Sequence, residues 1–183
     1  MTAAPTPPRR TLLGHVPTKW LRPRRLDVVV RLLLVALFGT ILVLLSRELA
    51  TLDARVVYPA ASVPEILAAM GEAGRAEYRL VAMLDCGFLV VYGWLLVTWV
   101  RFLKLRHGLP KRLPAALALV PSLFDAIETG SVLRLLSRFP EDDPTFAWAA
   151  SLATPLKWFA FAVVVITLVV GEITKWHHRH DAR

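Results

Sequence analysis

The sequence predicts an all-α integral membrane protein, built as a bundle of four transmembrane helices. Of its 183 residues 56% are hydrophobic and the mean hydropathy is +0.53, which is too apolar for a domain with a hydrated surface. Four stretches are as long as the roughly 20 apolar residues that a helix needs to cross a bilayer. Basic residues cluster between these stretches, so the net charge of +8 indicates loops at a membrane surface and no nucleic-acid partner. These observations argue against a soluble single-domain enzyme.

The chain divides into a transmembrane domain and two tails. Residues 1–26 are rich in Pro and Arg and are expected to form a disordered cytoplasmic tail. Residues 27–172 form the transmembrane domain, with spans at about 28–46, 80–100, 113–133 and 147–170. Residues 173–183 form a basic, His-rich cytoplasmic tail.

The first span is expected to stay in the mature protein. The basic segment before it is longer than that of a cleaved signal peptide, and no small-x-small cleavage site follows it.

The distribution of basic residues among the connections predicts the orientation of the spans in the membrane. Fourteen Lys and Arg lie before the first span, in the 101–112 connection and after the fourth span, whereas the other two connections carry six Arg and eight acidic residues. The positive-inside rule therefore predicts that both termini are cytoplasmic, and we expect a bacterial inner membrane.

The connection from residue 47 to 78 is predicted to contain a short amphipathic helix. Ser62-Val63-Pro64-Glu65 is typical of a capped helix start, with a serine followed three residues later by a glutamate. The helix is expected to run towards Tyr78 with Ile66 and Leu67 on its apolar face. It either lies flat on the outer membrane surface or packs on the bundle. In the 101–112 connection, Gly108 and Pro110 predict a tight turn that makes spans two and three antiparallel neighbours.

Three acidic residues and one lysine are expected inside the spans: Asp85, Asp125, Glu128 and Lys157. At about 1.5 Å per residue all four reach a similar depth in the outer half of the bundle. Each would cost about 2.5–3.5 kcal/mol if it faced lipid at mid-span, so we expect them to face inward. Asp125 and Glu128 share one helix face, and Tyr92 lies on the same stripe as Asp85. The sequence therefore predicts one polar core.

Two interpretations of this core compete. In the first, Lys157 pairs with Asp125 or Glu128 and Tyr92 donates to a carboxylate, so the charges specify which helices are neighbours. In the second, three carboxylates exceed one ammonium, so at least one acid stays protonated or binds a cation or an amine. A third possibility is that a partner subunit completes the cluster. Pro121 and Pro155 are expected to kink their helices at this layer, which either opens a cavity or only perturbs packing.

No metal or cofactor is expected. The spans contain no histidine, and the sequence has no phosphate-binding glycine loop, nucleophile elbow or His-Glu-x-x-His motif. The run Trp176-His177-His178-Arg179-His180 is expected to be a solvated end of the chain, not a metal site. Cys86, the single cysteine, is expected to be a packing residue.

Several short motifs occur in a fixed order along the spans. They are Met70-Gly71-Glu72, Leu84-Asp85 with Phe88 and Tyr92, Phe124-Asp125-Ala126-Ile127-Glu128, and Lys157-Trp158-Phe159. Over about residues 38–170 the chain resembles a group of bacterial four-transmembrane-helix proteins that carry Asp and Tyr in the second helix, Asp-x-x-Glu-Asn in the third and Lys in the fourth. Thr129 stands in the place of the Asn. The resemblance implies the topology and a shared polar core, and it implies no activity. In architecture alone, the chain is also similar to sterol isomerases and sigma-2 receptor-like proteins, which use intramembrane carboxylates on an amine or a carbocation.

Three functions remain open from the sequence. We expect first a binding or accessory membrane protein whose polar core holds a lipid, an amine or a partner helix. The second is an enzyme that acts on a lipophilic substrate, with Glu128 or Asp125 as a protonated acid and Lys157 as its charge partner. The third is a proton or cation carrier. The expected partners are the lipid bilayer, a lipid or lipophilic small molecule, and a second copy or another membrane subunit.

Overall fold

The computed structural model describes residues 25–47, 51–52, 55–103 and 113–180, and in these ranges it contains helices and no strand. The predicted disorder of the N-terminal tail and most of the predicted turn between spans two and three lie outside the described residues. The elements, in chain order, are α1 (Arg25–Ser46), the 3-10 helix η2 (Ala60–Ser62), α2 (Val63–Ala69), α3 (Gly71–Leu103), α4 (Leu113–Leu117), α5 (Val120–Arg138) and α6 (Pro144–His180).

Four helical segments in the described chain are long and apolar enough to cross a membrane: Leu26–Ser46, Gly71–Leu103, Leu113–Arg138 and Pro144–Thr174. This confirms the predicted all-α bundle, and by length and composition the chain is a multi-pass membrane protein. The segments extend beyond several of the predicted limits. In particular, α6 stays helical to His180, so much of the predicted C-terminal tail continues the fourth helix.

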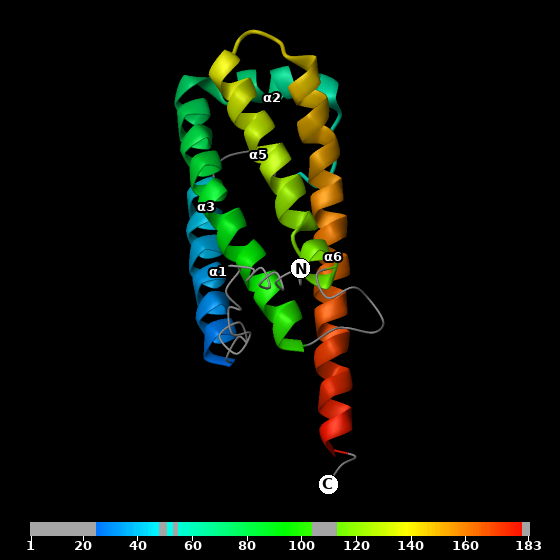
Figure 1. Ribbon diagram of the computed structural model, residues 1–183. Coiled ribbons are helices and arrows are strands. Elements are labelled where there is room, and N and C mark those ends of the chain that lie inside the picture. The colour runs from blue at the N-terminus through cyan, green and yellow to red at the C-terminus, as the bar shows by residue number, and fades with distance from the viewer. Residues whose placement is uncertain (1–24, 48–50, 53–54, 104–112, 181–183) are drawn as a thin grey trace, which may run out of the picture.

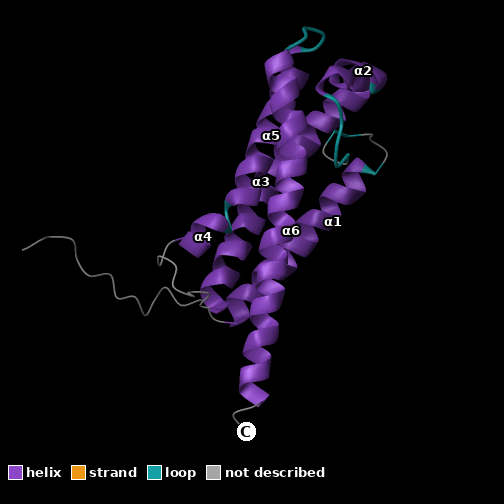
Figure 2. Ribbon diagram, turned by 90° about the vertical axis from the view of Figure 1, so that its right-hand side faces the viewer, coloured by secondary structure: helices purple, strands orange, loops and turns teal. Residues whose placement is uncertain are grey.

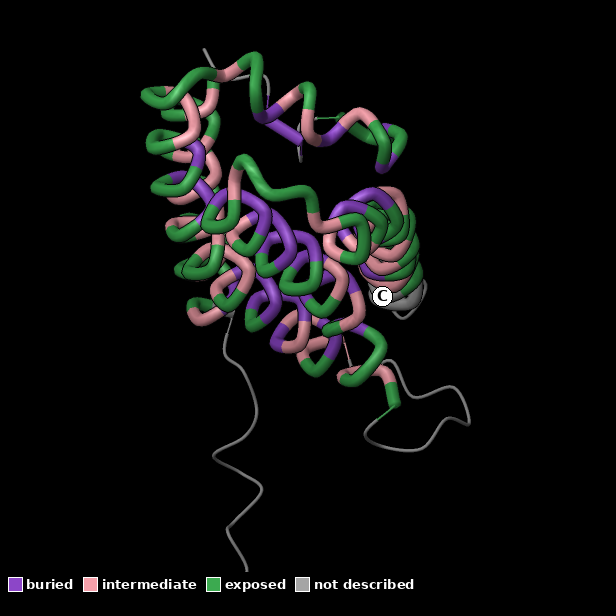
Figure 3. The backbone as a smooth tube through the Cα atoms, turned by 90° about the horizontal axis from the view of Figure 1, so that it is seen from above, coloured by how far each residue is buried: buried purple, intermediate pink, exposed green. Residues whose placement is uncertain are grey.

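The centre of the bundle is formed by α3, α5 and α6, and α1 packs against α3 on the outside (Figures 1 and 2). The helix α5 contacts both α3 and α6. The short helix α2 crosses one end of the bundle, called here the α2 end (Figure 1). Seen from above, buried segments lie where helices face one another, and the outer sides are mostly exposed (Figure 3).

The connection between α1 and α3 differs from the prediction. Instead of one helix reaching Tyr78, α2 ends at Ala69 and α3 begins at Gly71, which has a φ of +67°. Glycine adopts this left-handed conformation without strain and commonly follows the last turn of a helix. The helix start near Ser62 is correctly predicted, but the serine hydroxyl donates to the carbonyl of Pro59 at 2.8 Å and makes no capping hydrogen bond.

The apolar face of α2 packs on the bundle. Val63 and Leu67 are fully buried, and they join a hydrophobic cluster with Tyr78 of α3 and Leu135 of α5. The sequence left two placements of this helix open, flat on the membrane surface or packed on the bundle, and the structure shows it packed on the bundle. The preceding chain contributes too, because Leu52 is buried and its backbone N–H donates to the Tyr78 hydroxyl at 3.1 Å.

The third span is broken near its start, where a kink at Pro121 is expected. A turn at Ala118 and Leu119 separates α4 from α5, and α4 lies at an angle to α5 (Figure 2). Pro121 stands in the first turn of α5, where a missing N–H costs no helical hydrogen bond. Pro121 thus lies just after the point where the third span, Leu113–Arg138, changes direction, as expected for a proline that interrupts the helical hydrogen bonds. Pro155 differs, since α6 continues on both sides of it.

Two apolar clusters divide the interior along its length. The cluster at the α2 end includes Val81 of α3, Val132 of α5 and Ala150 of α6. The cluster towards the opposite end includes Leu96 of α3 and Leu168 of α6. Between them lies a polar layer, and its residues form the candidate site.

Candidate functional site

The polar layer contains two acids from α5 and one lysine from α6. Asp125 and Glu128 lie one helical turn apart and point into the bundle, with 4% and 1% of their surfaces exposed. Lys157 faces them from α6, and 13% of its side chain is exposed. Because α5 lies between α3 and α6, its acids are enclosed by protein and not by lipid.

Lys157 forms ion pairs with both carboxylates. Its Nζ lies 2.9 Å from Oδ1 of Asp125 and 2.5 Å from Oε2 of Glu128. In a region without water, such contacts offset the cost of removing the charges from solvent only when the remaining oxygens are also hydrogen-bonded. Both acids meet this condition. The Tyr92 hydroxyl of α3 donates to Oδ2 of Asp125 at 2.8 Å, and the Thr154 hydroxyl of α6 donates to Oε1 of Glu128 at 2.5 Å.

The chain before α2 also reaches the polar layer. The Tyr58 hydroxyl lies 3.4 Å from Oγ1 of Thr154, and the Ser151 hydroxyl donates to the backbone carbonyl of Tyr58 at 2.5 Å. Tyr58 is 3% exposed. Because the single Thr154 proton is directed to Glu128, the Thr154 oxygen can accept from Tyr58. The connection after α1 therefore closes the polar layer on the side of the α2 end.

Asp85 occupies a neighbouring position on α3. It is half-buried and accepts a hydrogen bond from the Thr129 hydroxyl of α5 at 2.8 Å. Thr129 follows Glu128 directly, so Asp85 adds a third carboxylate close to the same turn of α5.

The charges in this layer do not balance. If Asp125 and Glu128 are ionised, they carry two negative charges against the single ammonium of Lys157, and Asp85 would add another. An uncompensated charge in a low-dielectric region is costly. Among the described residues, neutrality of this layer would require a proton or a further cation.

Aromatic rings form a row beside the Asp125–Lys157 pair. The ring centroids of Phe88 and Tyr92 are 5.2 Å apart, those of Tyr92 and Phe161 are 6.2 Å apart, and those of Phe161 and Trp158 are 6.4 Å apart. Trp158 is 46% exposed, whereas Tyr92 is buried. The row thus runs from the outer surface of α6 to the hydroxyl that holds Asp125.

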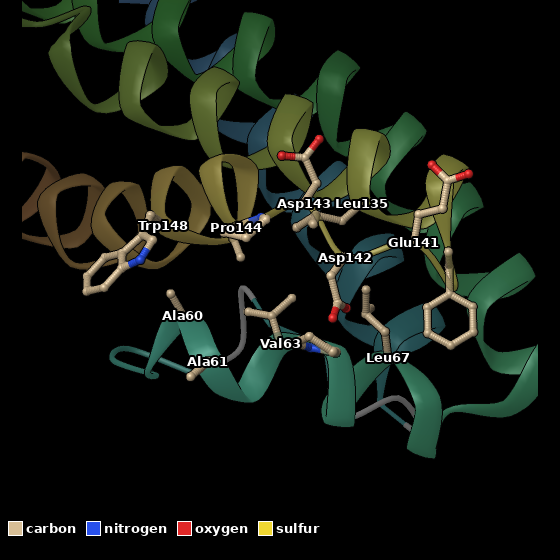
Figure 4. A pocket seen from close by; sticks show the side chains of 13 residues that line it. Ala60, Ala61, Val63, Leu67, Leu135, Glu141, Asp142, Asp143, Pro144 and Trp148 are labelled. Atoms are coloured by element: carbon tan, nitrogen blue, oxygen red, sulfur yellow. The ribbon is translucent and has the colours of Figure 1, made fainter.

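A separate cavity of about 330 Å³ lies at the α2 end (Figure 4). Its walls include Val63 and Leu67 of α2, Leu135 of α5 and Ala147 of α6, and three acids of the α5–α6 connection stand at it: Glu141, Asp142 and Asp143. The Asp142 side chain points towards Val63 and Leu67, whereas the Asp143 carboxylate points away from them (Figure 4). None of the charged residues of the polar layer lines this cavity.

The chain matches no protein-family model, no curated protein and no solved structure. The site must therefore be interpreted from its own geometry. In the described residues, no group of three or more His, Cys, Asp or Glu is placed to hold a metal ion. Cys86 is exposed on α3, so the burial expected for this packing residue is not found.

The structure thus brings together Tyr92, Asp125, Glu128 and Lys157 and places Asp85 beside them. Sequence reasoning missed three further contributors: Tyr58, Thr129 and Thr154. The signal in the sequence for Thr154 was its spacing, since it lies one turn before Lys157 on the same helix face. Tyr58 carried no such signal, because it lies in an irregular connection.

Proposed function

We propose that this protein is a small membrane binding protein whose polar layer holds the amino group of a lipophilic amine. The observation that carries the proposal is that two buried carboxylates, Asp125 and Glu128, share one lysine. A ligand ammonium would supply the missing positive charge in a region where unpaired charge is costly. The ligand ammonium would be compatible with the existing hydrogen bonds of the layer, because one carboxylate oxygen can accept from more than one donor.

The aromatic row supports an organic cation over a bare proton. Aromatic faces attract ammonium groups, most strongly where water is excluded. The rings of Tyr92, Phe161 and Trp158 connect Asp125 to the outer surface of α6. An amphiphile in the bilayer could place its amino group at Asp125 and its apolar chain along these rings and the surrounding lipid.

The test compares two probes that differ in one group. Dodecylamine and dodecanol are added below their micellar concentrations to the protein in lipid nanodiscs, and thermal unfolding is followed. We expect the amine to raise the melting temperature more than the alcohol does. In Asp125→Asn, which keeps the shape of the side chain, this difference should disappear. The matched control is Asp142→Asn, which removes an acid away from the polar layer and should keep the preference.

Two outcomes would contradict the proposal. Equal shifts with both probes would show that only the alkyl chain binds. If Asp125→Asn and Glu128→Gln both fold and keep the preference for the amine, the two carboxylates do not bind it. Native mass spectrometry of the protein extracted gently from its own membrane complements this test, because it detects a copurifying amine, lipid or subunit in the same spectrum.

We further propose that the protein lies in a bacterial inner membrane with both ends in the cytoplasm. The even number of candidate spans and the excess of basic residues at the opposite end from α2 support this orientation. A phosphatase reporter fused after Arg183 should be inactive, and the same reporter inserted in the α5–α6 connection should be active. The reverse pattern would contradict the orientation.

A further inference from the structure

Another charged residue, Arg31, lies within a span, on a helix that contributes no side chain to the polar layer. Arg31 stands on α1, six residues after the start of the helix, where it faces α3. Its Nη1 donates to the Thr98 hydroxyl at 2.6 Å, and its guanidinium lies 3.7 Å from the centroid of the Trp94 ring. Thr98 is buried, so the arginine is held from one side by a hydroxyl and from another by an indole.

Neither of these partners neutralises the arginine. A hydroxyl and an indole are uncharged, and none of the ion pairs seen between described residues includes Arg31. A guanidinium has five N–H donors, so most of them are left for other acceptors after the bond to Thr98. An arginine in a span is costly when it faces lipid without a counter-charge.

Arg31 lies near one end of its candidate span, which begins at Leu26. It lies roughly 9 Å along α1 from Arg25, at the end of the bundle where α3 finishes at Leu103. Trp94 is 59% exposed on the outer side of α3, so the contact opens towards lipid. Tryptophan is typical of the boundary between lipid headgroups and hydrocarbon, and long basic side chains extend towards it.

We infer that Arg31, held by Thr98 and Trp94, binds the phosphate of an anionic phospholipid at the α1–α3 contact. The planar fork of the guanidinium fits a phosphate with two parallel hydrogen bonds, and stacking on an indole fixes the plane of that fork. The lipid headgroup supplies the negative charge that Thr98 and Trp94 lack. This site is independent of the polar layer, which is built from α3, α5 and α6.

The experiment measures lipid retention by native mass spectrometry. The purified, delipidated protein is titrated in a neutral detergent with phosphatidylglycerol and, separately, with phosphatidylcholine of the same acyl chains. We expect the wild type to bind phosphatidylglycerol more tightly, and Arg31→Gln to weaken that binding about tenfold with little change for phosphatidylcholine. The matched control is Arg101→Gln, which removes the same charge near the same end of the bundle and should change the affinity less than about threefold.

Further measurements distinguish a phospholipid site at Arg31 from a site for a free anion and from the amine site in the polar layer. Inorganic phosphate in millimolar excess should not displace the lipid, and full displacement would assign the site to a free anion. Asp125→Asn should keep the lipid preference even if it loses the amine. Thr98→Val and Trp94→Leu leave Arg31 in place and should each weaken binding about threefold, so they test the site if Arg31→Gln does not fold. Equal retention by the wild type and Arg31→Gln, or equal losses in Arg31→Gln and Arg101→Gln, would overturn the inference.

Discussion

The first and third spans are both long apolar segments, yet they occupy opposite environments. Only 6% of the most apolar stretch of the first span is buried in the protein, against 44% for the third span. The third span is also the less apolar of the two, because it carries Asp125 and Glu128. The span that is least compatible with lipid is therefore the one that the protein encloses most.

This difference shows what holds a bundle together in a membrane. Lipid chains are as apolar as leucine, so apolar surface alone gives little drive for helices to associate. The helix α5 is bound to α3 and α6 by ion pairs and hydrogen bonds. By contrast, α1 meets α3 through packing of the Phe88 ring near Gly39 and through the contact of Arg31 with Thr98. We therefore expect substitutions at contacts of α5 to cost more than comparable substitutions on α1.

The largest effect is expected for Lys157→Met. The substitution leaves Asp125 and Glu128 buried without their ammonium, and breaking a buried pair costs about 3–5 kcal/mol of the free energy of unfolding. Chemical unfolding in detergent micelles measures this loss. The double variant with Glu128→Gln should recover part of it, because one of the two uncompensated charges is then removed. A single variant as stable as the wild type would mean that the ion pairs do not hold α5.

The same substitution at two glycines sharpens the comparison. A methyl group at Gly93 of α3 would lie 2.5 Å from Oγ and 3.3 Å from Cβ of Ser122 on α5, so Gly93→Ala should destabilise the protein by about 2 kcal/mol. At Gly39 of α1 the methyl group would lie 3.8 Å from the Phe88 ring, so Gly39→Ala should change stability by less than about 0.5 kcal/mol.

Both glycine variants are measured by thermal unfolding under one set of conditions. The addition of Ser122→Ala to Gly93→Ala removes the closest atom and should restore part of the stability. Equal effects at the two glycines would remove the distinction between a tight α3–α5 contact and a looser α1–α3 contact.

A smaller effect is expected for Tyr92→Phe. It removes the hydrogen bond to Asp125 and keeps the ring in the aromatic row, so the loss should be about 1 kcal/mol, near the upper part of the range for such bonds in membranes. A double-mutant cycle with Asp125→Asn isolates the coupling between the two side chains. A coupling energy near zero would show that the bond does not stabilise the fold.

The smallest effect is expected for Leu33→Ala on α1. This side chain is 66% exposed and faces lipid in the monomer, so the free energy of unfolding should stay within about 0.5 kcal/mol of the wild type. The variant is measured in nanodiscs, where lipid surrounds the helix. A loss of several times that size would indicate that a partner subunit covers this face of α1.

Much of the fold could be predicted from the sequence because the length of an apolar run is a direct consequence of bilayer thickness. The details that failed depend on local backbone chemistry. Gly71 ends α2 and starts α3 within one residue, and the third span changes direction by a turn at Ala118 and Leu119, just before Pro121. In both cases the residue type signals a disturbance, but its form depends on the packing of neighbouring elements.

Only the charged residues of the candidate site could be predicted from the sequence. Asp125, Glu128 and Lys157 were recognisable because charge in a span requires a partner. Thr154 was not, since threonine is common in transmembrane helices and most often bonds its own backbone. Arg31 was overlooked because it lies near the end of its span, where a long side chain can extend to the membrane surface.

The length of α6 gives the polar layer a mechanical connection to the end of the chain. The segment from Lys157 to His180 is a continuous helix without proline, roughly 35 Å long, and it extends past the other helices (Figure 1). Pro155 lies just before it and lacks the N–H that would tie that point to the preceding turn. A bend of about 5° beside Lys157 would displace the far end of this helix by about 3 Å, so a small change of angle at the polar layer corresponds to a larger displacement beyond the bundle.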